Sequence, residues 1–314
     1  MNATTKTIRA AAIQLDAPLG DTDQFLADSE RLVLAAIKDG AEWVILPEFF
    51  STGMGFDPRI SASAPGADGA PTALLARLAA QHGVQVGGSA LVRDADDHVR
   101  NGFFLFGPDG LAGRHDKDLP TMWENALYVG GSDPGRLQVD GLSVGVALCW
   151  ELMRSQTVAR LGGEVDLVVG GSGWWSLPEW PLLDGAERRN LARANAAPAT
   201  FARHLGAPVI HAAHAGRIDC DFLGTPLRYR GRLEGGAQIC DADGQVLAFR
   251  ARDEGAGFVV ADLPLTRRPA TYASDRFWLQ RRGWVATAAW HYHNRVGRRF
   301  YERTHQARIK QDAR

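Results

Sequence analysis

Hydrophobic positions along the chain follow two periods, one typical of buried strands and one typical of amphipathic helices. Short apolar runs bounded by turn residues predict strands over residues 8–15, 43–46, 84–91, 103–106, 111–115, 142–148, 166–169, 209–213, 237–249 and 257–263. Apolar residues at helical spacing predict helices over residues 25–37, 72–81, 152–161 and 198–205. Strands alternate with helices, but hairpin turns at residues 107–110 and 241–244 interrupt the alternation. The pattern therefore favours a layered α/β fold with mixed sheets over a purely parallel one.

Turn residues predict the boundaries of two of these helices. Asp21, Thr22 and Asp23 are capping candidates before the first helix, and Gly40 is expected to stop it. Pro198 is expected in the first turn of a later helix, where its missing N–H has no cost, with Gly206 as the stop.

Composition suggests one domain with a basic extension. The chain has 314 residues, of which 45% are hydrophobic, and no repeat or low-complexity linker interrupts residues 1–264. Residues 265–314 carry twelve Lys or Arg against three Asp or Glu, although the whole chain has a net charge of -1. A net charge this small gives no overall attraction to nucleic acid or to an anionic membrane.

The cysteines and the hydropathy indicate a reducing, aqueous compartment. Cys149, Cys220 and Cys240 show no C-x-x-C spacing, which argues against a disulfide framework or a zinc site. The N-terminal apolar run is too short for a signal peptide, and no stretch approaches the roughly 18 apolar residues of a membrane span. The expectation is a soluble, cytoplasmic protein in which Cys220 and Cys240 are inert.

Cys149 is the first candidate for chemistry. It ends a predicted strand in VGVALCWE, and a helix is expected to start just after it. A strand-to-helix turn exposes a side chain, and a helix N-terminus stabilises a thiolate. The alternative is a buried core cysteine, because free cysteines behave as small hydrophobes.

Three charged residues also lie at or near strand ends. Glu48 follows the apolar run WVIL, and Lys117 ends the stretch LAGRHDK. Glu124 lies among apolar residues seven positions later, and Lys117 is a plausible partner for its charge. Taken singly, Glu48 and Lys117 are as readily explained as solvated surface residues.

The combination has a mechanism. A cysteine needs a base to become a nucleophile, and a carboxylate can serve if burial adjusts its pKa. Attack on a carbonyl or nitrile carbon creates negative charge on oxygen or nitrogen, which a lysine ammonium and a backbone N–H stabilise. Strand ends that meet at one edge of the fold would bring these groups together.

The same residues resemble the signature of the nitrilase superfamily, the carbon–nitrogen hydrolases, which is a Glu–Lys–Cys triad in that order. The matching segments are LPEFFSTG around Glu48, GRHDKDLPTMWE around Lys117 and Glu124, and GVALCWELMR around Cys149. Weaker matches are DLVVGGSGWW, LGAPVIHAAHAG and ICDADGQVL, so the resemblance covers about residues 8–263. Three dispersed motifs in register form a specific signal.

This resemblance implies a four-layer αββα sandwich, paired into homodimers or higher homo-oligomers, without a metal or organic cofactor. It implies Cys149 as nucleophile, Glu48 as general base and Lys117 as stabiliser of the tetrahedral intermediate. Glu124 would position substrate or assist proton transfer, and the backbone N–H of Trp150 would be a second oxyanion donor. The triplet Cys149-Trp150-Glu151 is similar to true nitrilases, whereas LGAPVIHAAHAG is more similar to amidases.

Several aromatic and histidine residues are weaker candidates. Trp174 and Trp175 follow the strand after Cys149 and are equally well explained as substrate-pocket or core residues. His211 and His214 lie on opposite faces of a strand and lack a third ligand, so no metal site is predicted. His214 is expected near the pocket mouth.

The extension at residues 265–314 mixes aromatic residues with arginines. Such interleaving occurs in proteins that bind single-stranded nucleic acid, but no recognisable nucleic-acid module accompanies it. We favour a helical extension that packs its aromatics on a neighbouring subunit.

The resulting hypothesis is a hydrolase that converts a small-molecule amide to an acid and ammonia through a thioester. A nitrilase that acts on a small-molecule nitrile is the nearest alternative, and an acyltransferase would use the same acyl-enzyme. A non-catalytic binding or assembly protein on this scaffold is an alternative of another class, although it would have no physical reason to retain all four polar residues.

Overall fold

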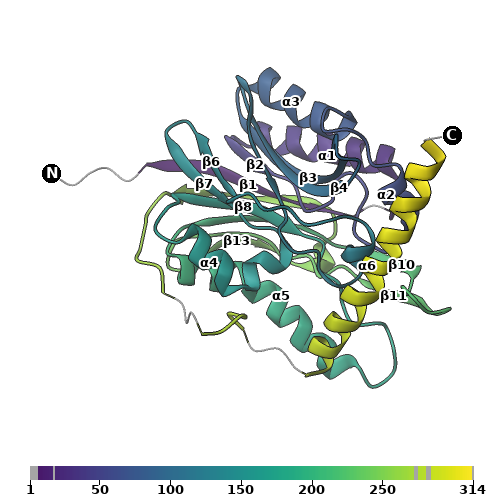
Figure 1. The fold of residues 1–314 in the computed structure, drawn as a ribbon. Coiled ribbons are helices and arrows are strands. Elements are labelled where there is room, and N and C mark those ends of the chain that lie inside the picture. Colours follow the sequence, from purple (N-terminus) through teal and green to yellow (C-terminus); the bar gives the residue numbers. More distant parts are fainter. Residues whose placement is uncertain (1–5, 17, 272–274, 281–283, 313–314) are drawn as a thin grey trace.

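The computed structural model describes residues 6–16, 18–271, 275–280 and 284–312. Two layers of strands lie between two layers of helices, with α1 and α3 on one side and α4 and α5 on the other (Figure 1). The predicted four-layer αββα sandwich with mixed sheets is confirmed, since each interface between layers contains its own hydrophobic cluster.

The strands form one sheet that folds back on itself, in the order β5-β4-β3-β2-β1-β9-β8-β7-β6. β12 pairs with β9 and β13, and β14 pairs antiparallel with β1. β10 (Arg217–Asp221) and β11 (Arg228–Arg232) form a separate hairpin. The strands of the main sheet are β1 (Thr7–Leu15), β2 (Trp43–Ile45), β3 (Gln85–Arg93), β4 (Val99–Gly107), β5 (Gly110–Asp116), β6 (Arg136–Val139), β7 (Leu142–Val146), β8 (Leu167–Ser172), β9 (Val209–His214), β12 (Ala237–Cys240), β13 (Val246–Arg250) and β14 (Gly257–Pro264).

Alternate residues along a strand face the two different layers on either side of it. In β1, Ala10 and Ala12 face the core between the strand layers, whereas Ala11 and Ile13 face the helices. The helices are α1 (Thr22–Lys38), α2 (Pro58–Ala62), α3 (Ala70–His82), α4 (Ser155–Leu161), α5 (Asp184–Leu205) and α6 (Trp284–Asp312). Short 3₁₀ helices are η1 (Met122–Ala126), η2 (Cys149–Met153) and η3 (Arg252–Glu254).

The predicted boundaries are right at α1, whereas at α5 the predicted end at Gly206, which has φ of 75°, is right and the predicted start is wrong. Asp21 caps α1 by accepting from the Gln24 N–H at 3.1 Å, and Gly40 follows with φ of 87°. Pro198 lies inside α5 and not in its first turn. An apolar face that continues past the proline offsets the lost hydrogen bond; it comprises Ala194, Ala197, Phe201, Ala202 and Leu205.

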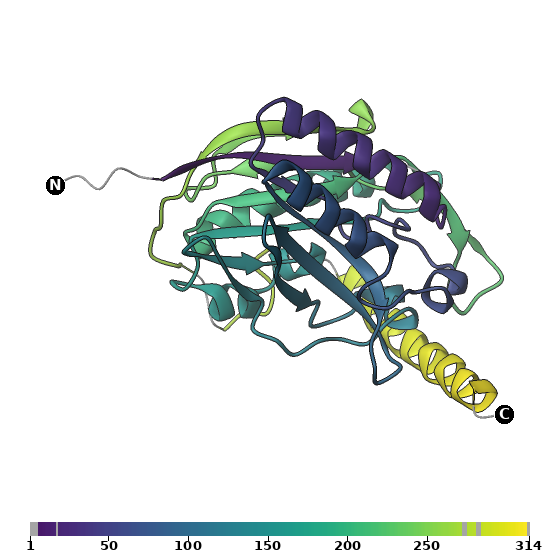
Figure 2. The same ribbon diagram turned by 90° about the horizontal axis from the view of Figure 1, so that it is seen from above.

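The C-terminal extension packs on its own chain. α6 runs beside η1 and projects past the body of the molecule (Figure 2). The Tyr301 hydroxyl, near its far end, accepts from the Val99 N–H at 3.0 Å. Packing against a neighbouring subunit therefore stays a prediction, as does the division at residue 264.

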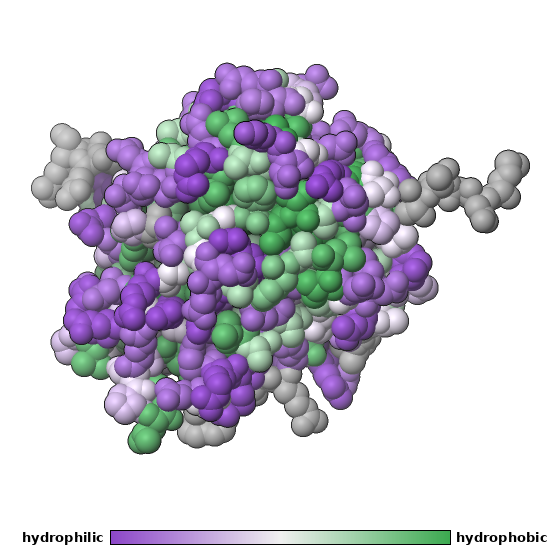
Figure 3. Space-filling model, turned by 180° about the vertical axis from the view of Figure 1, so that it is seen from behind, coloured by the Kyte–Doolittle hydropathy of each residue, from purple (hydrophilic) through white to green (hydrophobic). Residues whose placement is uncertain are grey.

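The rear face of the molecule has hydrophobic side chains gathered in a strip across its middle, with hydrophilic side chains around it (Figure 3). Exposed apolar patches commonly mark contact surfaces. The predicted homo-oligomer would need such a surface, and its existence stays a prediction. Within the described residues, every helix is too short or too polar to cross a membrane.

Candidate active site

Four predicted site residues converge at one end of the strand layers. Glu48 lies three residues beyond β2, Lys117 directly follows β5, and Cys149 begins η2 after β7. Oxygens of Glu48 and Glu124 and the Cys149 sulfur all lie within 4.8 Å of one another. Glu48, Lys117 and Glu124 are fully buried, and Cys149 is 3% exposed. The prediction that these strand ends bring the four side chains together is confirmed, whereas their chemical roles stay predictions.

Two glycines in β8 allow this convergence. A Cβ at Gly171 would lie 2.7 Å from the Pro47 Cα, and a Cβ at Gly170 would overlap the Ala147 carbonyl. Because glycine has no side chain, β8 passes directly beneath the segments that lead into Glu48 and Cys149.

Lys117 forms a buried ion pair with both carboxylates. Its Nζ donates to Glu48 Oε1 at 2.8 Å and to Glu124 Oε2 at 2.7 Å. Burial alone would lower the lysine pKa, but the charges of Glu124 and Glu48 outweigh burial and raise the pKa well above its ordinary value. The ammonium is therefore a permanent positive charge beside Cys149.

The surroundings of Glu124 destabilise its negative charge, and one of its two oxygens accepts no hydrogen bond from the described residues. Burial raises its pKa to about 7; Lys117 opposes this rise and the charge of Glu48 adds to it. Oε2 accepts from Lys117, from the Thr121 N–H at 3.0 Å and from the Tyr128 hydroxyl. Oε1 is buried and has no hydrogen-bond partner among the described residues. Glu124 can therefore exchange a proton near neutral pH and accept one more hydrogen bond.

The Cys149 thiol is neutral at rest, contrary to the expectation of a helix-stabilised thiolate. Burial raises its pKa well above the ordinary value, and the nearby charge of Glu48 raises it further. The element that follows is a five-residue 3₁₀ helix, and the α-helix starts only at Ser155. Cys149 itself has φ of 50°, a conformation that costs free energy in a non-glycine residue and turns the backbone sharply after β7.

Glu48 is held from several directions. Asn101 Nδ2 donates to Oε1 at 2.9 Å, and the Gly173 N–H donates to Oε2 at 3.3 Å. Ser89 Oγ in turn donates to Asn101 Oδ1 at 2.8 Å. The sequence analysis did not identify Asn101, although an asparagine inside the apolar strand VRNGFF is a detectable signal.

His214 lies beneath the site, so its expected position at the pocket mouth is wrong. It is 1% exposed, and its Nε2 donates to the main-chain oxygen of Glu48 at 2.7 Å. Burial lowers its pKa to about 4, which keeps the ring neutral. His214 therefore positions the Glu48 backbone.

Two of the three predicted tryptophans pack in the same cluster as the nucleophile, and the third does not. Trp150 and Trp174 are buried in the cluster that contains Cys149, with ring centroids 6.1 Å apart. Trp175 is half-buried and packs on Trp123 at 4.1 Å between centroids, further from the cysteine cluster. The oxyanion role of the Trp150 N–H stays a prediction.

A second buried charged group lies beside the first, and the sequence analysis did not identify it. Glu151 is fully buried and faces His115 Nε2 at 3.2 Å and Arg160 Nη2 at 3.5 Å. His115 also contacts Asp133, with Nδ1 and Oδ1 2.6 Å apart. Since Glu151 lies two residues after Cys149, and His115 two before Lys117, this group links the segments that carry both residues. We refer to it as the Glu151 network.

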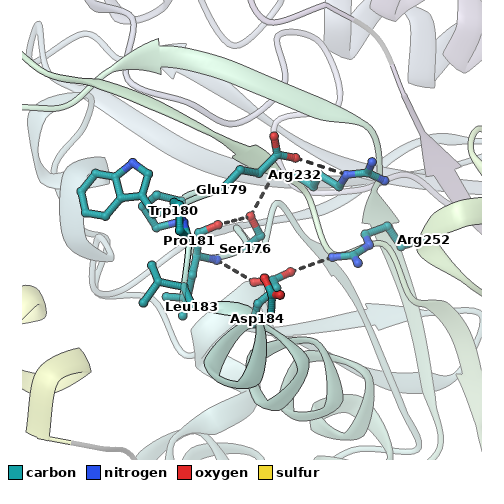
Figure 4. A pocket seen from close by; sticks show the side chains of 11 residues that line it. Ser176, Glu179, Trp180, Pro181, Leu183, Asp184, Arg232 and Arg252 are labelled. Carbon is teal, nitrogen blue, oxygen red and sulfur yellow. Dashed lines mark hydrogen bonds and ion pairs between the residues drawn. The ribbon is translucent and has the colours of Figure 1, made fainter.

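A hollow of about 410 Å³ is lined by residues of the segment 176–187 together with Arg232 and Arg252 (Figure 4). Ion pairs join its walls, with Arg252 Nη1 2.9 Å from Glu187 Oε1 and Arg232 Nε 3.5 Å from Glu179 Oε1. None of the predicted site residues lines it.

The carboxylates and thiol of the site are donor types that can hold a metal ion. The Lys117 ammonium, however, contacts both carboxylates and places a positive charge between them. This ion pair disfavours a cation at the same carboxylates, and the expected absence of a metal stays a prediction.

Comparisons with known proteins agree with these observations. A family model described as carbon–nitrogen hydrolase matches residues 9–297. A nitrilase from Pyrococcus abyssi is 27% identical over 168 residues, which cover 50% of this chain and 63% of that protein. An aliphatic nitrilase from Sinorhizobium fredii is 28% identical over 163 residues, covering 46% and 53% respectively. The chain thus matches little more than half the length of these curated relatives.

Solved structures share the fold at low identity. A carbon–nitrogen hydrolase from Helicobacter pylori has a TM-score of 0.70 and 17% identity, covering 83% of this chain and 90% of its own. An amidase mutant from Nesterenkonia has a TM-score of 0.63 and 18% identity, with 82% and 93% covered, and carries acrylamide added at its active-site cysteine. The family model, which spans most of the sequence and includes all four converging residues, shows that the chain belongs to the carbon–nitrogen hydrolase family.

Proposed function

We propose that this protein hydrolyses a non-peptide amide to a carboxylic acid and ammonia through a thioester on Cys149. The observation that carries the proposal is the buried group in which Cys149, Glu48 and Glu124 lie within 4.8 Å and Lys117 contacts both carboxylates. It combines a nucleophile, two proton-exchanging groups and a fixed positive charge.

In the first step Glu48 removes the thiol proton as Sγ attacks the carbonyl carbon. The thiol has a raised pKa, so proton transfer accompanies attack and no thiolate is stored beforehand. The four hydrogen-bonding groups that face the Glu48 side chain and backbone hold it for this transfer; they are Asn101, Lys117, Gly173 and His214. Lys117 and the Trp150 N–H stabilise the oxyanion.

In the second step ammonia leaves and the thioester remains. The leaving nitrogen needs a proton, and Glu124, with a pKa of about 7, can supply it near neutral pH. The thiol proton held by Glu48 then passes to Glu124, whose oxygen lies within 4.8 Å, so that Glu48 is a carboxylate again. Water then attacks the thioester with Glu48 as base, which returns the thiol and releases the acid.

The unpartnered oxygen of Glu124 supports an amide substrate over a nitrile. A buried acceptor without a hydrogen bond costs free energy, and the N–H of a primary amide would satisfy Oε1. A nitrile nitrogen has no hydrogen to donate. Hydrolysis of a nitrile through a thioimidate is the second candidate, favoured by the Cys149-Trp150-Glu151 triplet and by the nitrilase relatives.

Paired assays with an amide and a nitrile of the same side chain test the choice. We expect faster ammonia release from the amide, and faster release from the nitrile would reverse the assignment. Mass spectrometry of quenched reactions should detect an acyl group on Cys149. The Cys149→Ala variant should fold and show no turnover, and wild-type ammonia release by it would exclude the whole mechanism.

A further inference from the structure

The segment that precedes α6 pairs with the chain just beyond the nucleophile. The Leu279 N–H donates to the Met153 carbonyl at 2.8 Å, and the Ser155 N–H donates to the Phe277 carbonyl at 3.1 Å. Trp278 and Arg154 form an antiparallel bridge between these two bonds. Residues 277–279 are thereby attached to the end of η2, the turn that begins with Cys149.

α6 is attached to the other turn of the site, η1, which carries Glu124. Asn294 Oδ1 accepts from the Met122 N–H at 3.1 Å and from Asn125 Nδ2 at 2.9 Å. A Cβ at Gly297 would lie 2.8 Å from the Asn125 Cβ, so the helix approaches η1 as closely as a glycine allows. The C-terminal extension therefore spans the two turns that carry Cys149 and Glu124.

Two indoles of this extension pack on the cysteine cluster. Trp278 meets Trp150 edge-to-face at 5.7 Å between centroids, and Trp290 meets Trp278 at 5.8 Å. Both are half-buried, whereas Cys149, Trp150 and Trp174 are nearly inaccessible. The partly exposed residues packed against this cluster are Met122, Trp278 and Trp290, so the two indoles supply most of its solvent-facing apolar surface.

We infer that Trp278 and Trp290 form the outer wall of the substrate site and select amides that carry an aromatic or other flat apolar group next to the reacting carbon. A substrate that reaches Cys149 along its own cluster must pass these half-exposed rings. Indole faces bind flat apolar groups by stacking and edge contacts, and they leave small polar groups without comparable stabilisation. This inference rests on the proposed role of Cys149, and it makes the extension part of the site in the same chain.

The test uses wild-type protein, Trp278→Ala and Trp290→Ala, with Tyr292→Ala as matched control. Tyr292 is an exposed aromatic residue of α6, the helix that carries Trp290, and lies outside the cysteine cluster. Rates of Cys149 alkylation are measured by mass spectrometry with 2-chloroacetamide and with 2-chloro-2-phenylacetamide. In both reactions the sulfur–carbon bond forms as chloride leaves, and the thiol proton passes to Glu48.

The measured ratio is the Cys149 alkylation rate with 2-chloro-2-phenylacetamide divided by the rate with 2-chloroacetamide. We expect this ratio to fall about tenfold or more in each alanine variant. It should stay within about twofold of wild type in Tyr292→Ala. The ratio kcat/KM for phenylacetamide over acetamide should fall in parallel, mainly through KM. If an alanine variant does not fold, the Phe and Leu replacements are compared, and Phe should retain the higher ratio.

Gly297→Ala leaves both indoles in the chain but displaces α6, the helix that carries Trp290, from η1, so it should lower the ratio as well. Unchanged ratios in folded indole variants would overturn the inference, as would failure of wild-type Cys149 to react with either reagent. Alkylation that depends on the indoles without any amide turnover would instead refute the proposed function and leave the inference standing.

Discussion

Two turns of this protein share a local structure, but the pKa values of their buried glutamates are shifted in opposite directions. Both η1 and η2 are five-residue 3₁₀ helices that start with the pattern x-Trp-Glu, Met122-Trp123-Glu124 and Cys149-Trp150-Glu151. The first residue of each has a positive φ, 54° and 50° respectively. In each turn the glutamate accepts from the backbone N–H that precedes the turn, at 3.0 Å from Thr121 and 2.8 Å from Leu148.

The surroundings of the two glutamates decide their charge. Both are fully buried, which raises the pKa of a carboxyl group. Glu124 faces one cation and a second carboxylate, so its pKa stays raised at about 7. At Glu151 the charges of His115, Arg160 and Arg154 outweigh burial and hold the pKa well below its ordinary value. The same local motif thus holds a carboxyl group with a pKa of about 7 in one turn and a charged carboxylate in an ion-pair network in the other.

The largest expected effect is on stability, from Glu151→Gln. Removing one partner of a buried ionic network leaves the remaining charges uncompensated and typically costs about 3–5 kcal/mol. The free energy of unfolding, measured by urea titration, should fall by that amount. The matched variant Glu124→Gln leaves Lys117 paired with Glu48, so it should lose far less stability. Equal losses in the two variants would contradict the division of roles.

Lys117→Met should lower kcat/KM about 100- to 1000-fold, the typical effect of removing one group that stabilises an oxyanion. Steady-state kinetics with the best amide substrate measure the loss, and circular dichroism checks the fold. The pKa of Glu124 should also rise, because Lys117 is the cation that lowers it. Turnover within about tenfold of wild type would remove Lys117 from the mechanism.

His115 should make stability depend on pH. Burial lowers its pKa, but Glu151 and Asp133 outweigh burial and raise it to about 9, against an ordinary value of 6.5. A raised pKa means that the stabilisation is fully present below pH 6.5 and is lost as pH rises through about 9. The difference in unfolding free energy between wild type and His115→Gln should therefore shrink by about 3 kcal/mol from pH 6 to pH 10. A difference that is independent of pH would show that the ring is not charged.

The smallest effect concerns the pH profile of turnover. If protonated Glu124 supplies the proton to the leaving nitrogen, kcat falls as pH rises through about 7, by up to tenfold per pH unit. Glu124→Gln should be slower and should lose this limb of the profile. A limb that persists in Glu124→Gln must belong to another group.

Much of the site could be predicted from the sequence because its residues follow strand ends. Glu48 and Cys149 come after buried strands, and Lys117 directly follows β5, so the strand pattern predicts that the three lie close together, and the resemblance to the family assigns their roles. Asn101 and His214 lie inside strands, where neither the apolar pattern nor the motif marks which groups they contact. Pro198 was misassigned because a local rule about helix starts ignored the apolar packing that extends α5 through it.

The sequence by itself indicated the layered α/β class, the positions of most main strands along the chain and the four polar residues that converge. Those features depend on hydrophobic periodicity and on turn residues, which are properties of short stretches of sequence. Only the tertiary structure decided that Glu124 and Glu151 differ in charge, and that Trp278 and Trp290 lie against the cysteine cluster of their own chain. Electrostatic fields and aromatic packing depend on groups far apart in the chain, and spacing along the sequence does not record those distances.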